Sequence, residues 1–113
     1  TPLVHFLDTH DKRLIERIFQ SQSSHIYIYG AGQKGRRLAR YLQTEAPEIS
    51  LVGMIDRFPQ MTVFNGVQVS STLPRLKDEV IVVASFAYAD EIVEQLMQSS
   101  VPLNKIIAIC NRV

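Results

Sequence analysis

Three glycines at positions 30, 32 and 35 have the spacing in this 113-residue chain that most directly indicates chemistry. They match the pattern G-x-G-x-x-G, in which each glycine has a separate task. Gly30 permits a sharp turn, Gly32 lets a pyrophosphate approach the backbone, and Gly35 lets the following helix pack closely. The first N–H groups of that helix have no acceptor within it and donate to an anion. The spacing predicts a phosphate-binding loop.

A carboxylate stands where such a loop would use one. Asp56 follows Gly35 by 21 residues, about where an acidic residue binds ribose hydroxyls in dinucleotide sites. It favours NAD as the cofactor. The adjacent Arg57 instead suits the additional phosphate of NADP, so both cofactors stay open.

A basic cluster accompanies the loop, formed by Lys34, Arg36, Arg37 and Arg40. Lys34 lies between the second and third glycines, where its side chain is placed to reach a phosphate. Arg37 and Arg40 are expected on a solvated outer face of the helix. The residues predicted to contact a cofactor are Gly30, Ala31, Gly32, Gln33, Lys34, Gly35, Asp56, Arg57 and Ser85.

Ser85 follows the apolar run 80–84, which is typical of a buried parallel strand. If this strand lies next to the first one, Ser85 borders the crevice at the carboxyl ends of the strands. Its hydroxyl then either contacts the ligand or caps the following helix, and the two roles are compatible.

No catalytic residue and no metal site are predicted. Short-chain dehydrogenases and nucleotide-sugar epimerases use Tyr-x-x-x-Lys, but here the fourth residue after each tyrosine is Ala31, Gln33, Glu45 or Ile92. The three histidines show no metal-ligand spacing with one another or with the single cysteine, Cys110. Whether the parent protein is an enzyme, such as an epimerase/dehydratase or a transferase, is left open.

The elements that must position these residues alternate between helix and strand patterns. The patterns predict helices over 9–22, from the glycines to before Pro47, and around 90–97, with strands over 26–29, 51–55, 67–69, 80–84 and 106–109. A hairpin centred on Asn65-Gly66 is an equal interpretation of the weaker region, and 71–74 is expected to open a short helix. The alternation predicts an α/β fold: a small doubly wound parallel sheet, Rossmann-like, of order 3-2-1-4-5, with an extra N-terminal helix.

Length and composition limit the number of domains, the partners and the location that we expect. We expect one domain over 1–113, with a helical extension at 1–24 and the α/β body at 25–113, and the absence of Met at position 1 suggests a domain cut from a longer chain. The balance of 12 Lys+Arg against 11 Asp+Glu gives no nucleic-acid footprint. No apolar run approaches the ~20 residues that span a membrane. A single cysteine suits a reducing compartment, so a cytoplasmic location is expected.

Several segments together resemble a known family: IYIYGAGQKGRRLARYL, VGMIDRFPQ, NGVQV, VIVVAS and EIVEQL. In this order they are similar to CoA-binding-like, Rossmann-type domains that accompany bacterial polysaccharide and nucleotide-sugar biosynthesis enzymes. The resemblance covers about residues 24 to 109. It implies a nucleotide-type ligand on Gly30, Ala31, Gly32, Gln33, Lys34 and Asp56. Many members have an acid or Asn where this chain has Arg57, which leaves the ribose-side specificity open.

The first hypothesis is therefore a nucleotide-binding module, of NAD(P) type, within a polysaccharide or nucleotide-sugar biosynthesis protein. A nucleotide-sugar or CoA is an alternative ligand. The second hypothesis is a fragment of an NAD(P)-dependent oxidoreductase, epimerase or dehydratase. The third is a degenerate interaction domain whose loop is only structural. Beside a nucleotide, the expected partner is a second copy or another domain of the parent chain.

Overall fold

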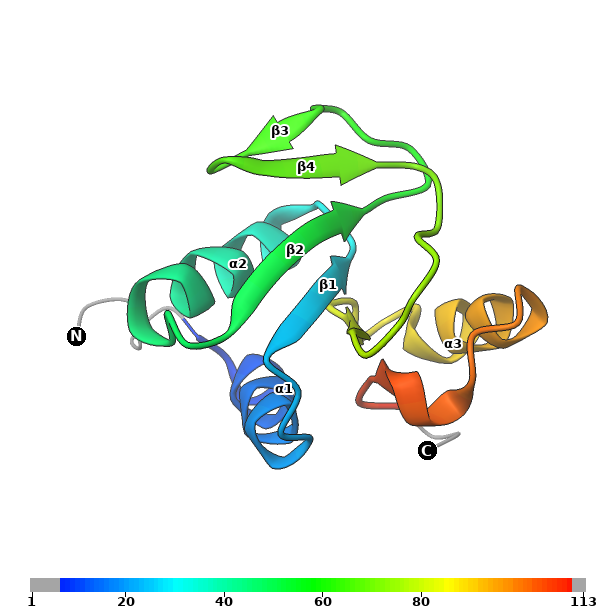
Figure 1. Ribbon diagram of the computed structural model, residues 1–113, viewed down its shortest axis with the longest axis horizontal. Coiled ribbons are helices and arrows are strands. Elements are labelled where there is room, and N and C mark those ends of the chain that lie inside the picture. The colour runs from blue at the N-terminus through cyan, green and yellow to red at the C-terminus, as the bar shows by residue number, and fades with distance from the viewer. Residues whose placement is uncertain (1–6, 111–113) are drawn as a thin grey trace.

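A six-stranded, mostly parallel sheet forms the middle of the structure, a computed structural model that describes residues 7–110 (Figure 1). The sheet order is β3-β4-β2-β1-β5-β6. The strands are β1 (His25–Tyr29), β2 (Ser50–Ile55), β3 (Val63–Phe64), β4 (Val67–Ser70), β5 (Val80–Val83) and β6 (Ile106–Ile107). The helices are α1 (Thr9–Gln20), α2 (Gln33–Glu45) and α3 (Ala89–Gln98), with a 3-10 turn at Leu103–Lys105. No helix in this part of the chain has the length and apolarity to cross a membrane.

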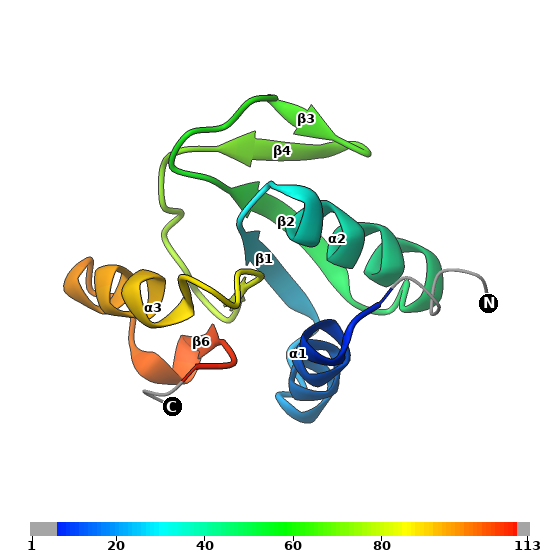
Figure 2. The ribbon, with the colours of Figure 1, turned by 180° about the vertical axis from the view of Figure 1, so that it is seen from behind.

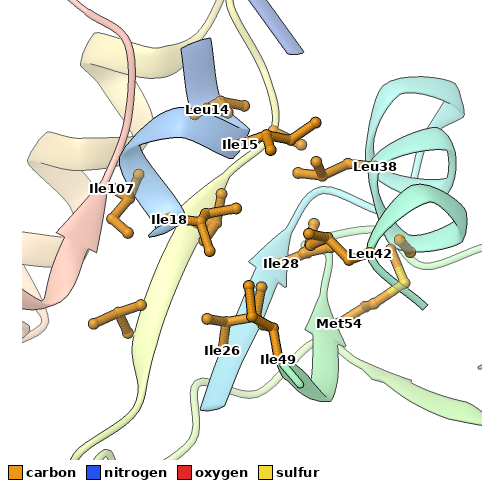
Figure 3. Packing of buried hydrophobic residues seen from close by; sticks show 14 of the residues in the cluster. Leu14, Ile15, Ile18, Ile26, Ile28, Leu38, Leu42, Ile49, Met54 and Ile107 are labelled. Atoms are coloured by element: carbon orange, nitrogen blue, oxygen red, sulfur yellow. The ribbon is translucent and has the colours of Figure 1, made fainter. Parts of the chain in front are cut away.

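Helices cover both faces of the sheet because successive side chains of each strand point to opposite faces. On one face, α1 and α2 pack on the strands; Figure 3 shows Leu14 and Ile18 of α1 with Leu38 and Leu42 of α2 around Ile28. Seen from behind, α2 lies across β2 (Figure 2). On the other face, the apolar side of α3 packs on β5. All four residues of β5 are buried, as expected for a strand covered on both faces.

The expected α/β alternation is confirmed, but the expected five-strand order is incomplete. The hairpin interpretation of residues 57–78 is the correct one: Asn65 and Gly66 both have positive φ, at 49° and 79°, and join β3 to β4 in antiparallel pairing. This turn adds β3 at the edge of the sheet, beyond the strand expected there. Positive φ at both central residues is what a tight hairpin turn requires.

The prediction that a short helix opens at 71–74 is wrong. Residues 71–79 cross from β4 to β5 without helix or strand. Leu73 and Leu76 are partly buried and pack against the α3-side core, so this irregular segment covers sheet that a crossover helix would cover. A helix does not open there because Pro74 has no N–H to donate and restricts the preceding Leu73 to an extended backbone.

α1 begins and ends at specific local contacts. Asp8 accepts a hydrogen bond from the Asp11 N–H while Asp11 accepts one from the Asp8 N–H, which forms a capping box. The helix stops at Gln20, two residues before the expected end, and Gln22 has a left-handed φ of 60°. Phe19, expected on the buried stripe, is 46% exposed. β6 is also shorter than the strand expected over 106–109.

Candidate ligand-binding site at the glycine loop

The glycine loop is a tight turn from β1 into α2. Gly30 has a φ of 110°, and its N–H donates to the Ile55 carbonyl at 2.7 Å. A Cβ at Gly35 would lie 1.8 Å from the Gly30 carbonyl oxygen, a distance that no side chain tolerates. Both positions therefore require glycine, Gly30 for its backbone angle and Gly35 for the close approach of helix to turn. The sequence prediction for these two positions agrees with this geometry.

The middle glycine leaves the start of α2 open. Gly32 is the N-cap residue of α2 and provides no side-chain hydrogen bond to the first turn. A Cβ at Gly32 would meet nothing within 4 Å, and Gly32 and Gln33 are exposed. The first N–H groups of a helix have no acceptor within the helix. Among the described residues, no side chain caps these donors at Gly32.

Asp56 is bonded to the backbone of this loop. One carboxylate oxygen accepts from the Ala31 N–H at 2.8 Å, and the other accepts from the Phe58 N–H at 2.9 Å. The Asp56 N–H in turn donates to the Ser70 carbonyl at 2.9 Å. Asp56 thus links the ends of β1, β2 and β4, and its carboxylate points toward the glycine loop.

Lys34 and Arg37 point away from the loop, toward α1. The Lys34 ammonium lies 2.9 Å from Asp8 and 3.5 Å from Asp11. The Arg37 guanidinium lies 2.7 Å from Asp11 and 3.4 Å from Asp8. The expectation that Arg37 lies on a solvated outer face is wrong, because α1 covers this side of α2 with two acids.

This network shifts the pKa of Asp8. Its partial burial opposes ionisation, but the Asp11 N–H, the Lys34 ammonium and the Arg37 charge favour it more strongly. The net result is a pKa lowered from 3.8 to about 2.

Arg36 and Arg40 take different directions. The Arg36 Nε donates to the Gly32 carbonyl at 3.3 Å, so its guanidinium lies at the first turn of α2. None of the salt bridges among the described residues involves Arg36. Arg40 lies over the Phe64 ring at 5.4 Å. Arg36 is therefore the cation that the structure holds at the loop, a role that the sequence pattern alone did not separate from the rest of the basic cluster.

Arg57 and Ser85 lie on the neighbouring loops, where each makes a hydrogen bond within the protein. Arg57 donates to Gln95 on α3 at 3.3 Å and lies 5.7 Å from the Phe58 ring centroid. The Ser85 hydroxyl accepts from the Tyr88 N–H at 3.1 Å. Ser85 thus caps the turn that leads into α3, while Tyr88 is the N-cap residue of the helix itself.

Exposed aromatic rings stand on the loops that follow β2 and β5. Phe58, Phe86 and Tyr88 are 80%, 62% and 65% exposed. These loops meet the glycine loop, since Ala84 N–H donates to the Tyr29 carbonyl at 3.0 Å and a Gly30 Cβ would lie 3.8 Å from the Ala84 Cβ. The carboxyl end of the sheet therefore combines open helical N–H groups with exposed aromatic surface.

His10, in the first turn of α1, lies against the loop that follows β5. Its ring is 5.1 Å from the Phe86 ring, and both ring nitrogens are buried without a hydrogen-bond partner. Burial, followed by the nearby Lys34 charge, lowers its pKa below 6.5.

Asp8, His10 and Asp11 bring potential metal-ligand atoms within 4.8 Å of one another. The spacing of the histidines and Cys110 does not reveal this group, because its other two members are aspartates in the D-x-H-D segment where α1 begins. Lys34 and Arg37 already balance the charge of the two carboxylates. The group therefore fits an ion-pair network between helices better than a cation site.

The fold and loop define a small α/β domain with an open glycine loop at the carboxyl end of its sheet. The chain belongs to the C2185-like family: the model described as C2185-like, N-terminal, matches residues 22–107. This finding corrects the resemblance to CoA-binding-like domains of polysaccharide and nucleotide-sugar biosynthesis proteins, because the family is a different one. No curated protein matches the chain.

Proposed function

We propose that this domain is a binding module that holds a nucleotide, with NAD or NADP as the leading ligands, by its phosphates on the loop from Gly30 to Gly35. The observation that carries the proposal is the open first turn of α2 at Gly32, which presents backbone donors without a capping side chain. Such a helix start favours a phosphate through its N–H groups and its dipole. The biosynthetic setting that rested on the earlier resemblance is not part of the proposal.

The position of the loop supports the same function. β1 lies between β2 and β5, both parallel to it, and the connection from β1 leads to β2 on one side while β5 pairs on the other. In doubly wound, Rossmann-like sheets, ligands bind at the carboxyl end where the connections diverge in this way. The glycine loop occupies that place.

Each neighbouring group has a role in this proposal. The Arg36 guanidinium adds positive charge at the phosphates, and Asp56 holds the loop while its remaining lone pairs face the ribose. The exposed rings of Phe58, Phe86 and Tyr88 offer apolar surface to the base. All of these roles concern binding, and no residue is assigned to catalysis.

Thermal unfolding with NAD, NADP, CoA and a UDP-sugar tests the proposal. A ligand at 100 times its dissociation constant stabilises the folded state by about 2.7 kcal/mol. We expect such a shift with NAD or NADP in the wild-type chain and its loss in Gly32→Val, whose side chain covers the donors. Thr44→Val, an exposed change at the other end of α2, is the matched control and should keep the shift.

Two outcomes contradict the proposal. A full shift in Gly32→Val shows that the ligand binds elsewhere. No shift with any of the four ligands supports the alternative that the loop is structural and that the domain serves protein contacts.

A further inference from the structure

We propose that α1 restrains the phosphate affinity of the glycine loop by holding the Lys34 ammonium on Asp8, and that a bound phosphate competes for this ammonium. The inference rests on the proposed function, since it concerns the strength of binding at the same loop. It assigns Asp8 as a residue that sets ligand affinity from a helix that does not form the loop.

Lys34 belongs both to the glycine loop and to the ion-pair network with α1. Its backbone lies in the first turn of α2, two residues after Gly32, while its ammonium lies 2.9 Å from Asp8 and 3.5 Å from Asp11. A lysine carries a compact charge on a flexible four-carbon stem, so its ammonium can change partners without any movement of the helix. A phosphate at the first turn of α2 is a strong competing partner for this charge.

The network is built so that Lys34 can leave it. Asp11 is 1% exposed, and its Oδ2 keeps the Arg37 guanidinium at 2.7 Å when Lys34 moves. Its Oδ1 is buried without a hydrogen bond and gives up only a 3.5 Å contact with the Lys34 ammonium. The Asp8 side chain is 52% exposed, so water replaces the lost ammonium there. Ion pairs with an exposed partner contribute little to stability. Arg37 therefore holds α1 on α2, and Lys34 is the exchangeable cation.

Charge balance explains why this contact restrains binding. Asp8 and Asp11 face Lys34 and Arg37, two negative charges against two positive ones. With Lys34 held there, Arg36 is the cation that remains at the loop. α1 also lies before residues 22–107, so the restraint belongs to an element outside the part that the family model matches.

Asp8→Asn tests the inference because asparagine is as good an N-cap residue as aspartate, yet carries no charge. We expect the variant to bind pyrophosphate and NAD roughly two- to fivefold more tightly than the wild-type chain in calorimetric titration, the range for loss of one exposed ion pair. Glu48→Gln, an exposed acid just beyond α2, is the control for net charge and should leave the affinity unchanged.

A double-mutant cycle shows whether the effect acts through Lys34. In Lys34→Met, which keeps the length of the side chain, we expect weaker pyrophosphate binding. Adding Asp8→Asn to Lys34→Met should then bring no gain. Circular dichroism of each variant confirms that the fold is retained.

The outcomes separate the two proposals. If the wild-type chain binds and Asp8→Asn binds no more tightly than Glu48→Gln, the restraint is wrong while the proposed function stands. The restraint is also wrong if Asp8→Asn gains affinity equally without Lys34. If neither the wild-type chain nor any variant binds pyrophosphate, NAD or NADP, the proposed function fails and the restraint fails with it.

Discussion

At the scale of single residues, Asp56 illustrates how a side chain can serve a loop before it serves any ligand. Both carboxylate oxygens accept backbone N–H groups, from Ala31 and from Phe58. An ionised acceptor makes stronger hydrogen bonds to such donors than a neutral one. Asp56 therefore keeps the glycine loop and the end of β2 together whether or not a ribose is present.

Gly32 and Gly35 differ sharply in how much stability a side chain there would cost. We expect Gly35→Ala to lower the free energy of unfolding by about 3 kcal/mol or more, because the new Cβ would overlap the Gly30 carbonyl. Gly32→Ala, where a Cβ meets nothing within 4 Å, should change stability little. Urea unfolding of both variants measures the difference. Equal stabilities would mean that α2 does not pack against the turn as closely as the structure shows.

At the scale of elements, the α1–α2 pair is held by charge as well as by apolar packing. Leu14 and Ile18 of α1 are fully buried against the same core as Leu38 of α2. The ion pairs then connect the first turns of both helices at the end nearest the glycine loop. Apolar packing and ion pairs therefore both attach α1 to α2.

Acid should weaken this attachment in a defined range of pH. The pKa of Asp8 falls from 3.8 to about 2 in the folded state, against the effect of partial burial, because the Asp11 N–H and Lys34 favour its charge. The unfolded chain thus takes up this proton first. The contribution of Asp8 is fully present above about pH 4 and disappears as the pH falls toward 2. Thermal unfolding between pH 5 and 2 should show a smaller loss in Asp8→Asn than in the wild-type chain. An identical loss in both would contradict this role.

At the scale of the whole molecule, the two faces of the sheet are covered unequally. α1 and α2 cover one face, whereas α3 and the irregular segment 71–79 cover the other. A hollow of about 370 Å³ remains between β2, β4 and this segment, lined by Tyr27, Val52 and Leu73 among others. The second face is therefore closed by a segment that lacks helical hydrogen bonds.

Truncating one leucine of α3 and one of segment 71–79 should reveal how differently the two pack on the sheet. Leu96 of α3 is 1% exposed, so Leu96→Ala should cost about 2–5 kcal/mol. Leu73 is only partly buried and borders the hollow, so Leu73→Ala should cost clearly less. Urea unfolding measures both. An equal loss would show that segment 71–79 packs as tightly as α3.

Much of the fold was predictable from local pattern. The spacing of Leu38 and Leu42 predicted α2, and its end before Pro47 is confirmed. The Asn65-Gly66 pair signalled the hairpin, but the edge strand β3 that it creates was not part of the expected order. Two-residue strands such as β3 carry no periodic signal of their own, because their pairing depends on the partner strand.

The sequence by itself determined the turn at the glycines, since the space at Gly35 depends on Gly30, its neighbour in the chain. Ile55 and Asp56, from a different strand and loop, then hold this turn on the sheet. Only the tertiary structure decided where the charges go. Lys34 meets Asp8, and Arg57 meets Gln95, across 26 and 38 positions of the chain. Such partners depend on how whole helices pack on the sheet, and a charged side chain on an exposed face carries no local signal of which helix will cover it.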